Sequence, residues 1–359
     1  MLYPILSPYL LSIGLSSIVL GFLVSIVSFV RIPLLAFSGF LSDLFDRRTL
    51  LALGFASSAL GTLLLGTARD ISLLIVARFI QGFFGAWVFP ITIALVSDHI
   101  PKEKTGLFMA IFNASMSTGL IVGPALGGFL ADTYYYNVVF IVSASILCAV
   151  SLLSMLVPSE KARLSEGLRG FRNVMNKELI LTYLITFADW FTLFTWLTFI
   201  PLYLVQRLGV TTTFAGIFIS IESFAYTLTQ IPYGALRDRI GGFLLVSFTL
   251  PVYPILLYTV TITSSNWLLV ALAIAIGVVD APVYLVCLSN IAKYAPKNIR
   301  GTASGFLTMA TDLGALGPLT GGVILQATNT YEYIFIPTVT IAIVTALLSI
   351  RLHTMKHGA

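Results

Sequence analysis

The hexapeptide GPALGG at residues 123–128 returns as GPLTGG at residues 317–322, so the pattern G-P-x-x-G-G is written twice in this chain. Both copies lie inside apolar segments. A proline removes one backbone hydrogen bond from a helix, and each interior glycine costs about 1 kcal/mol relative to alanine. A pattern this unfavourable indicates a bend where a neighbouring helix comes very close. Its repetition predicts a duplicated helical protein with one such contact in each half.

The composition indicates that most of the surface faces lipid. Hydrophobic residues make up 58% of the chain and charged residues 10%, whereas a soluble domain has about 25% charged residues. The mean hydropathy is +0.98. A soluble core could not hide so much apolar surface, so we expect an integral membrane protein. Cys148 and Cys287 both lie in apolar runs and do not form the pattern of a disulfide scaffold or a metal site.

Eleven segments are apolar and long enough to cross a bilayer as helices, which takes about 20 residues. They cover residues 17–41, 49–68, 72–96, 105–131, 138–157, 179–203, 212–236, 243–263, 267–291, 302–325 and 333–351. Residues 1–14 are also apolar but supply only part of a span. The sequence therefore predicts an all-α integral membrane protein with eleven full spans and a partial first helix.

One connection is long and polar. The stretch PSEKARLSEGLRGFRNVMNKE at residues 158–178 carries charges of both signs near the middle of the chain. We interpret it as a cytoplasmic linker between an N-terminal helix bundle, residues 1–157, and a C-terminal bundle, residues 179–359. Most lysines and arginines then fall in cytoplasmic loops, as the positive-inside rule requires. The net charge of +5 is thus explained by the basic loops on the cytoplasmic side of a cell membrane, and we expect no binding of nucleic acid. The same alternation of loops predicts a cytoplasmic C-terminus.

The two halves of the sequence resemble each other along their length. The aligned features are Gly14 with Gly209, Gly21 with Gly216, Ser25 with Ser220, GFLSD at 39–43 with GALRD at 234–238, and PKEKTG at 101–106 with PKNIRG at 296–301. Such a repeat predicts two pseudo-symmetric six-helix bundles related by an axis along the membrane normal. The second half has a complete span, 179–203, before Gly209. We therefore expect that the first helix has lost its beginning through a late start or a truncation.

Four motifs, in order, resemble those of the major facilitator superfamily. The loop GFLSDLFDRR at 39–48 is similar to that family's G-x-L-x-D-R-x-G-R-K/R motif, with departures at Leu44 and Asp46, and GALRDRIGG at 234–242 is its second copy. RFIQGFFGA at 78–86 resembles the helix 4 motif R-x-x-Q-G-x-x-x-A. GLIVGPALGG at 119–128 resembles the helix 5 motif of proton-coupled antiporters, the multidrug-efflux-like branch. The resemblance covers nearly the whole chain and implies a twelve-helix transporter that works by alternating access.

The resemblance also implies a cytoplasmic gate. Its residues in this sequence are Gly39, Asp43, Arg47, Arg48, Gly234, Asp238 and Arg239. A glycine lets a helix end lie close to its neighbour, and Asp43 can pair with Arg47 or with a facing helix N-terminus. The alternative is a solvated loop whose charges merely follow the positive-inside rule.

Six ionisable side chains fall deep inside predicted spans: Arg31, Arg78, Asp189, Glu222, Asp280 and Asp312. In the resembled fold they lie on helices 2, 4, 7, 8, 10 and 11, which surround the central cavity. Charges inside a bilayer are costly unless they face protein or water. Both bases lie in the first half and all four acids in the second. The acids can bind a proton or a cationic substrate, whereas Arg78 can tune an acid or hold an anion. The alternatives are Arg–acid pairs that only join the halves and, for Arg78, a side chain that reaches the outer interface.

Further polar and aromatic residues continue these faces at helical spacing. The full set of candidates for binding substrate or protons is Arg31, Arg78, Gln81, Asn113, Asp189, Trp196, Glu222, Tyr226, Asp280, Tyr284 and Asp312. For the aromatic members, packing inside the bundle is the competing interpretation.

The hexapeptides supply a set of helix-packing candidates. The set is Gly119, Gly123, Pro124, Gly127, Gly128, Gly317, Pro318, Gly321 and Gly322. Glycines spaced by four free one helix face for a close neighbour. The resemblance implies that helix 5 meets helix 8, and helix 11 meets helix 2, across the boundary between the halves.

The sequence thus predicts a monomeric secondary active transporter that exports a small organic molecule, amphipathic or cationic, in exchange for protons. The alternatives are proton-linked uptake of a small metabolite, such as an organic anion held by the buried arginines, and a transport-defective relative with an incomplete first helix. The nucleotide-binding pattern G-x-x-x-x-G-K-[ST] is absent, and the three histidines lie in loops or the tail. We therefore expect no enzyme activity, no cofactor and no metal site.

Overall fold

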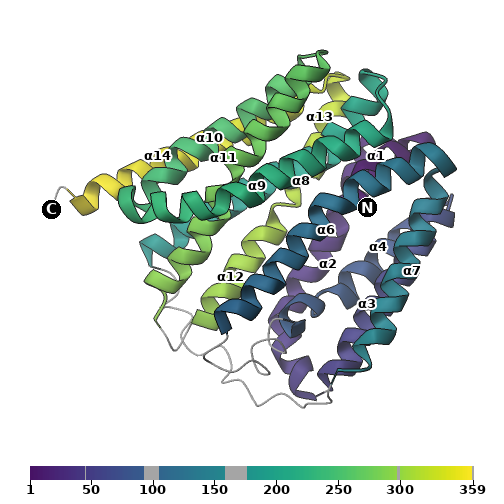
Figure 1. Ribbon diagram of the computed structural model, residues 1–359, viewed down its shortest axis with the longest axis horizontal. Coiled ribbons are helices and arrows are strands. Elements are labelled where there is room, and N and C mark those ends of the chain that lie inside the picture. The colour runs from purple at the N-terminus through teal and green to yellow at the C-terminus, as the bar shows by residue number, and fades with distance from the viewer. Residues whose placement is uncertain (45, 93–104, 158–175, 297–299, 358–359) are drawn as a thin grey trace.

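A computed structural model describes residues 1–44, 46–92, 105–157, 176–296 and 300–357, and the described residues form helices without strands (Figure 1). The side chains at 36–44, 105–110, 353 and 355–357 lie outside the description. The helices are α1 (Tyr3–Ser12), α2 (Ser17–Leu44), α3 (Arg47–Thr67), α4 (Ile71–Gly85), α6 (Thr105–Tyr134), α7 (Tyr136–Ser154), α8 (Lys177–Leu202) with the π-turn η3 (Tyr203–Arg207), α9 (Thr212–Ile240), α10 (Gly242–Thr261), α11 (Asn266–Tyr294), α12 (Arg300–Leu313), α13 (Leu316–Thr328), the short η5 (Glu332–Phe335) and α14 (Ile336–His357).

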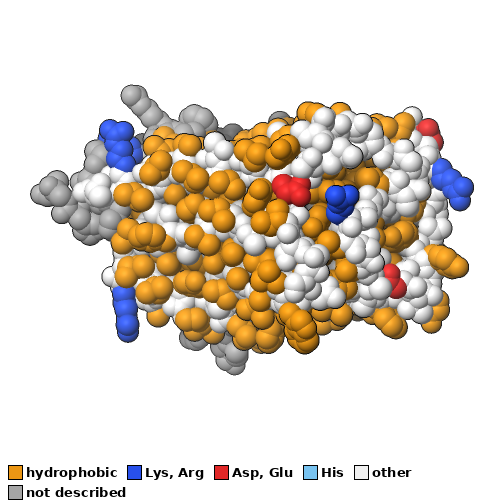
Figure 2. All heavy atoms as spheres, turned by 90° about the horizontal axis from the view of Figure 1, so that it is seen from above, with side chains coloured by type: hydrophobic (Ala, Val, Ile, Leu, Met, Phe, Trp, Pro, Cys, Tyr) orange, Lys and Arg blue, Asp and Glu red, His pale blue; other side chains and the backbone are white. Residues whose placement is uncertain are grey.

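Ten stretches of the described chain are helical, long and apolar enough to cross a membrane. Large hydrophobic side chains, among them Ile231, Phe248 and Leu152, are exposed on the outside. Hydrophobic side chains cover most of the face shown in Figure 2, and few charged ones interrupt them. An exterior of this kind is stable only in lipid. The predicted all-α membrane fold is confirmed.

The predicted span at 302–325 differs from the structure, because it is two helices, α12 and α13, with a break at residues 314–315. Pro318 has no N–H to donate to the Gly314 carbonyl, which a continuous helix would require. The Gly314 carbonyl instead accepts the Gly317 N–H at 2.9 Å. The Ala315 carbonyl accepts a hydrogen bond of 2.5 Å from Ser25 Oγ on α2. The break is thus stabilised by a neighbouring helix. Pro124, in the first hexapeptide, stays within the continuous helix α6.

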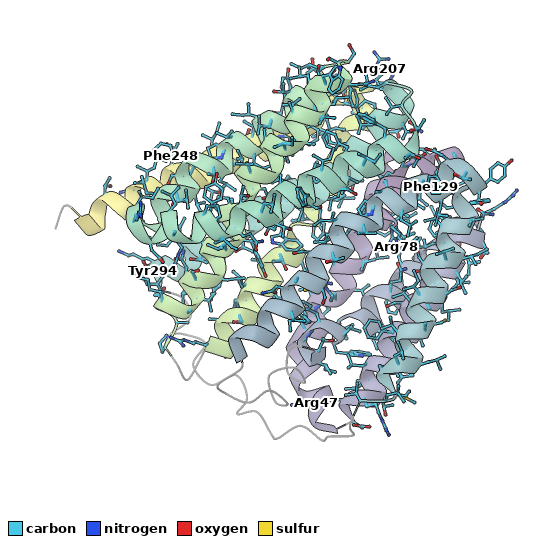
Figure 3. All side chains as sticks on the ribbon, viewed as in Figure 1. Arg47, Arg78, Phe129, Arg207, Phe248 and Tyr294 are labelled. Carbon is cyan, nitrogen blue, oxygen red and sulfur yellow. The ribbon has the colours of Figure 1, made fainter. Side chains whose placement is uncertain are left out.

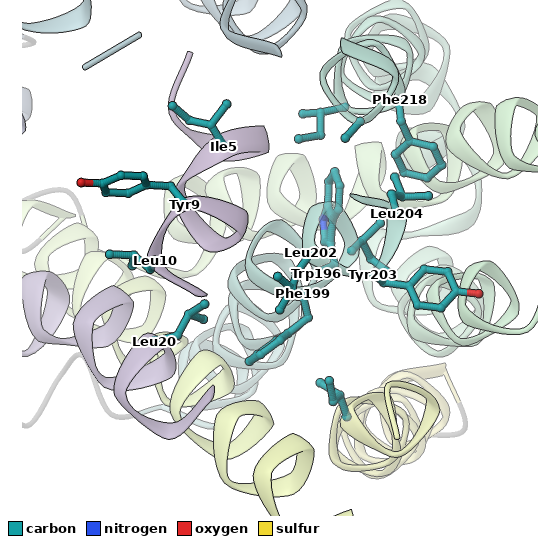
Figure 4. Close-up of a cluster of buried hydrophobic side chains, with 14 of the residues drawn as sticks. Ile5, Tyr9, Leu10, Leu20, Trp196, Phe199, Leu202, Tyr203, Leu204 and Phe218 are labelled. Atoms are coloured by element: carbon teal, nitrogen blue, oxygen red, sulfur yellow. The ribbon is translucent and has the colours of Figure 1, made fainter. Parts of the chain in front are cut away.

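The helices form two groups, α1–α7 (the N-terminal group) and α8–α14 (the C-terminal group), on the two sides of Figure 1. α6 packs along α9, and α2 packs along α13, so each group supplies one helix to each of the two contacts. A buried apolar cluster also crosses the boundary. It joins Ile5 and Leu10 of α1 and Leu20 of α2 to Trp196 and Phe199 of α8 (Figure 4).

Contacts between the groups gather at the end where α2 and α9 begin. There Asp132 of α6 accepts hydrogen bonds from the backbone N–H groups of Thr212 and Thr213 at 3.0 and 2.6 Å. Toward their other ends, residues 111–120 of α6 and 231–240 of α9 are exposed or only partly buried. The groups therefore touch at one end of the molecule and expose these two helices at the other.

Candidate functional site

Three buried carboxyl groups lie together where α8, α9 and α11 meet. Asp189, Glu222 and Asp280 are only 3%, 5% and 6% exposed. The side chains of Asp189 and Asp280 share a hydrogen bond, and Glu222 lies beside Asp280. A hydrogen bond between two carboxyl groups needs a proton, because two adjacent carboxylates repel and neither can donate. Two carboxyl groups placed in this way can share one proton.

Gly277 makes this approach of helices possible. It lies one turn before Asp280 on α11, and a Cβ atom there would overlap the Glu222 carbonyl of α9 and lie 2.9 Å from the Tyr226 nitrogen. The two backbones are thus in direct contact. Small residues at such crossings bring neighbouring side chains together, and here those side chains are Glu222 and Asp280.

Within the described residues, no basic side chain pairs with this acid cluster. Glu222 Oε2 accepts a hydrogen bond of 3.1 Å from Ser223 Oγ, and Asp189 Oδ1 has no partner. The partly buried Tyr226 is close to all three acids. Carboxylates removed from water without a counter-charge are strongly unfavourable. The cluster is therefore stable here only when protons neutralise part of it.

The fourth acid has a partner. Asp312 of α12 is fully buried and forms a two-pronged salt bridge with Arg31 of α2, in which Arg31 Nε lies 2.9 Å from Asp312 Oδ2 and Arg31 Nη2 contacts Oδ1. The Arg31 side chain is 32% exposed. This pair neutralises both charges and ties the N-terminal group to the C-terminal group.

Arg78 differs, because no carboxylate among the described residues forms a salt bridge with it. It is 8% exposed on α4, inside the N-terminal group (Figure 3). Its Nη1 donates to Gln81 Oε1 at 3.0 Å, and Gln81 Nε2 donates to Thr62 Oγ1 at 3.1 Å. Arg78 Nε has no hydrogen-bond partner, and none of the described carboxylates pairs with its charge. A Cβ on Gly82 would lie 2.6 Å from the Val27 carbonyl, so α4 crosses α2 closely one turn beyond Arg78.

Arg31 and Arg78 line a cavity of about 220 Å³ at the boundary of the two groups. Its wall comes mainly from α1, α2 and α8. The other polar lining residues are Tyr3, Ser7, Ser28 and Thr198. The acid cluster does not line this cavity. The structure therefore separates the predicted candidates into a basic cavity and a buried acid cluster.

The remaining candidates, Trp196, Tyr284 and Asn113, do not line the basic cavity. Trp196 is fully buried in the C-terminal group, with its ring 6.4 Å from that of Phe218, and does not line the cavity. Tyr284, one turn after Asp280, is partly buried and packs its ring edge-on against Trp190 at 5.7 Å. Asn113 is exposed on α6.

The described members of the gate set make local contacts. Arg48 Nε lies 3.4 Å from Asp46 Oδ2, and Arg237 Nη1 lies 2.9 Å from Asp238 Oδ1. Arg239 is exposed. Gly39 and Asp43 fall in the stretch 36–44, whose side chains lie outside the described part, so the gate stays a prediction.

The two hexapeptides make matching backbone contacts between the groups. A Cβ on Gly128 of α6 would overlap the Thr212 carbonyl of α9, and one on Gly216 would overlap the Pro124 carbonyl. In addition, the Ala125 N–H donates to Ser220 Oγ at 3.1 Å. α6 and α9 are thus in backbone contact at the first hexapeptide.

The second copy repeats this arrangement against α2. Gly322 meets the Ser17 carbonyl, and Gly21 meets the Pro318 carbonyl. Gly317 and Gly321 face Phe191 and Phe199 of α8.

The other two glycines of the first hexapeptide make a contact that corresponds to the contact of the second hexapeptide with α8. Gly123 and Gly127 face Met1 before α1, as Gly317 and Gly321 face α8. Gly119 differs from the other predicted packing glycines, because an added Cβ would meet nothing within 4 Å. It is exposed on α6 and is not at a close contact.

Several residues that line the cavity or join the two groups were not predicted from the sequence. Ser28 lies one turn before Arg31, so helical spacing could have placed it on the same face. Tyr3 and Thr198 could not be found this way, because the cavity joins helices that are distant in the chain. The bonds of Asp132 to α9 carry no sequence signal either.

A family model described as Major Facilitator Superfamily matches residues 1–200 and again residues 179–357. The chain belongs to the major facilitator superfamily. It is therefore a multi-pass membrane transporter rather than an enzyme. Transporters of this superfamily bind small-molecule substrates and sit in a lipid bilayer.

Relatives in this superfamily extend over most of the chain. Multidrug resistance protein 1 of Bacillus subtilis is 25% identical over 357 residues, which covers 96% of this chain and 90% of the relative. Multidrug resistance protein MdtG of Proteus mirabilis is 27% identical over 297 residues, with 79% and 73% covered.

Solved transporter structures share the fold. The nucleoside transporter NupG superposes with a TM-score of 0.78 at 14% identity, covering 98% of this chain and 94% of that one. A bacterial homolog of the human lysosomal transporter Spinster, inward-facing and unoccupied, has a TM-score of 0.80 at 13% identity, with 97% and 91% covered.

Proposed function

We propose that this superfamily member exports small organic molecules across the plasma membrane in exchange for protons, by alternating access. The observation that carries the proposal is the hydrogen-bonded pair Asp189–Asp280 with Glu222 beside it and no basic partner described. The relatives named as multidrug resistance proteins support export.

The acid cluster offers a direct way to couple protons to conformation. When it holds its protons, the cluster is stable in the dry contact between α8, α9 and α11. When it loses them, the negative charges need water or a cation, so a more hydrated conformation becomes favourable. Proton binding and release would thereby shift the balance between two packings of the same helices.

The proposed arrangement in the membrane follows the charge distribution of the sequence. We place the linker 158–178 and the C-terminus in the cytoplasm, with residues 1–157 and 179–359 as the two rocking bundles of a monomer. The closed end, where Asp132 meets α9, then faces outward. The basic cavity lies at the boundary that must open and close.

Transport by inside-out membrane vesicles tests this proposal. We would follow one cationic dye, ethidium, and one anionic dye, carboxyfluorescein, with the vesicle interior acidified. We expect proton-driven accumulation of at least one dye, and its loss in Asp280→Asn or after addition of an uncoupler. Asp70→Asn is the matched control, because Asp70 is an exposed helix cap and asparagine caps equally well.

Two results would contradict the proposal. One is dye movement that continues without a proton gradient, and the other is full activity in Asp280→Asn.

A second candidate function, proton-linked uptake of an organic anion, is favoured by one observation, the uncompensated charge of Arg78 at the cavity. Accumulation in right-side-out vesicles instead of inside-out ones would establish uptake as the direction.

A further inference from the structure

The cavity at the boundary of the two helix groups has an unbalanced charge. Two guanidinium groups line it, and the Arg31 charge is neutralised by the two-pronged salt bridge with Asp312. Among the described residues, Arg78 donates to the neutral Gln81 and lies near Tyr3, and no carboxylate pairs with it. The described residues therefore leave one positive charge at the cavity uncompensated.

The hydrogen bonds of Arg78 show which part of the side chain is available. Gln81 is held by Thr62 and in turn holds Nη1, so the guanidinium is oriented from one side. Nε is buried and has no partner. A guanidinium presents five N–H donors in a planar fork that matches a carboxylate. An unpaired charge that is 8% exposed is costly, and a bound anion would remove that cost.

We infer that the transported molecule carries an anionic group, and that Arg78 binds this group in the cavity between α1, α2, α4 and α8. This inference rests on the proposed transport function and adds the chemical class of the substrate. Arg31 is not the anion ligand, because Asp312 already occupies its fork.

The cavity wall indicates the rest of the molecule. Hydroxyl groups of Tyr3 and Ser7 can complete the hydrogen bonds of a carboxylate, whereas those of Ser28 and Thr198 already bond to Asp312 and to the Phe194 carbonyl. The remaining lining is largely apolar, with Phe194 among it. The volume of about 220 Å³ is below the roughly 300–1,000 Å³ of sites for drug-sized ligands. A carboxylate on a small aromatic or aliphatic body fits this size and polarity.

Proton and substrate sites are separate in this arrangement. The acid cluster is enclosed by α8, α9 and α11 and does not border the cavity. An anion at Arg78 therefore does not have to lie against the carboxylates. A cation bound in the cavity, by contrast, would face the positive charge of Arg78.

Binding to the purified full chain in nanodiscs tests the inference without any gradient. Three probes of nearly equal shape differ in charge: benzoate, benzamide and benzylamine. We expect benzoate to raise the thermal unfolding temperature at constant ionic strength, and the neutral and cationic probes to leave it unchanged. Arg78→Gln should weaken benzoate binding by about tenfold or more, since a charge-assisted bidentate contact is lost. Arg78→Lys should retain part of it.

Arg207→Gln is the matched control, because Arg207 is exposed and lies outside the cavity. The inference is overturned if benzamide stabilises the wild-type protein as much as benzoate, if benzoate has no effect, or if Arg78→Gln binds benzoate normally. If Arg78→Gln fails to fold, the comparison of the three probes on the wild-type protein still tests whether the site prefers an anion. Because no gradient is applied, these outcomes are independent of the vesicle experiment that tests transport.

Discussion

The salt bridge between Arg31 and Asp312 shows how much one buried charge depends on its partner. Asp312 is fully buried, whereas the Arg31 side chain is 32% exposed. Removing one member of a buried pair costs more than removing both, because the remaining charge has neither water nor a partner. The pair is thus a sensitive place to test the contact between α2 and α12.

We expect Arg31→Gln to destabilise the purified protein by about 3 kcal/mol, the low end for buried pairs because Arg31 is partly exposed. The double variant Arg31→Gln with Asp312→Asn should recover most of the loss. Thermal unfolding in detergent measures both. A loss in the double variant equal to the sum of the losses in Arg31→Gln and Asp312→Asn measured separately would show that the pair contributes no coupling.

At the scale of elements, the close crossing of α6 and α9 depends on glycine. Gly128→Ala places a methyl group on the Thr212 carbonyl, so the two backbones must move apart. Overpacking of this kind costs about 1–3 kcal/mol, and we expect a lower unfolding temperature together with slower transport. Gly119→Ala on the same helix meets only open space. It should be neutral or slightly stabilising, because alanine favours a helix.

The crossing of α9 and α11 supports the acid cluster. Gly277→Ala adds a methyl group at the Glu222 carbonyl and would separate Glu222 from Asp280 without changing an acid. We expect the variant to reach the membrane but to lose proton-driven transport. Gly305→Ala on α12, where nothing lies within 4 Å, is the control. Normal proton-driven transport by a folded Gly277→Ala would show that the spacing of the acids does not matter.

At the scale of the whole molecule, Asp132 ties the two groups together at the closed end. Its carboxylate accepts two backbone N–H groups and the Thr213 hydroxyl at the beginning of α9. Carboxylates at a helix N-terminus are favourable because of the helix dipole and the unpaired N–H groups there. Opening of this end has to break the contact.

Asp132→Ala should shift the population toward the conformation that is open at this end. Spin labels on cysteines at Tyr134 and Arg207, both exposed, would report it as a larger share of long distances, in a background where the exposed Cys148 is replaced by serine. Asp132→Asn keeps an accepting oxygen and should have an intermediate effect. Unchanged distance distributions in Asp132→Ala would rule out a role for this contact.

The sequence alone determined the membrane fold, the repeat and the identity of the buried charges. These features depend on the length of apolar runs and on spacing along one helix, as with Asp280 and Tyr284, so local patterns carry them. The duplicated hexapeptide likewise indicated two close helix contacts before any contact was known.

Only the tertiary structure decided which charges are paired. Arg31 meets Asp312, Asp189 meets Asp280, and Arg78 is left facing the cavity, because pairing depends on how helices rotate and cross. The break between α12 and α13 is likewise stabilised by a residue distant in the chain, Ser25 of α2. Partners far apart in the chain leave no trace in local spacing. For that reason the six buried ionisable residues of the sequence became a neutral salt bridge, a cluster of three acids and a guanidinium that no described carboxylate pairs with.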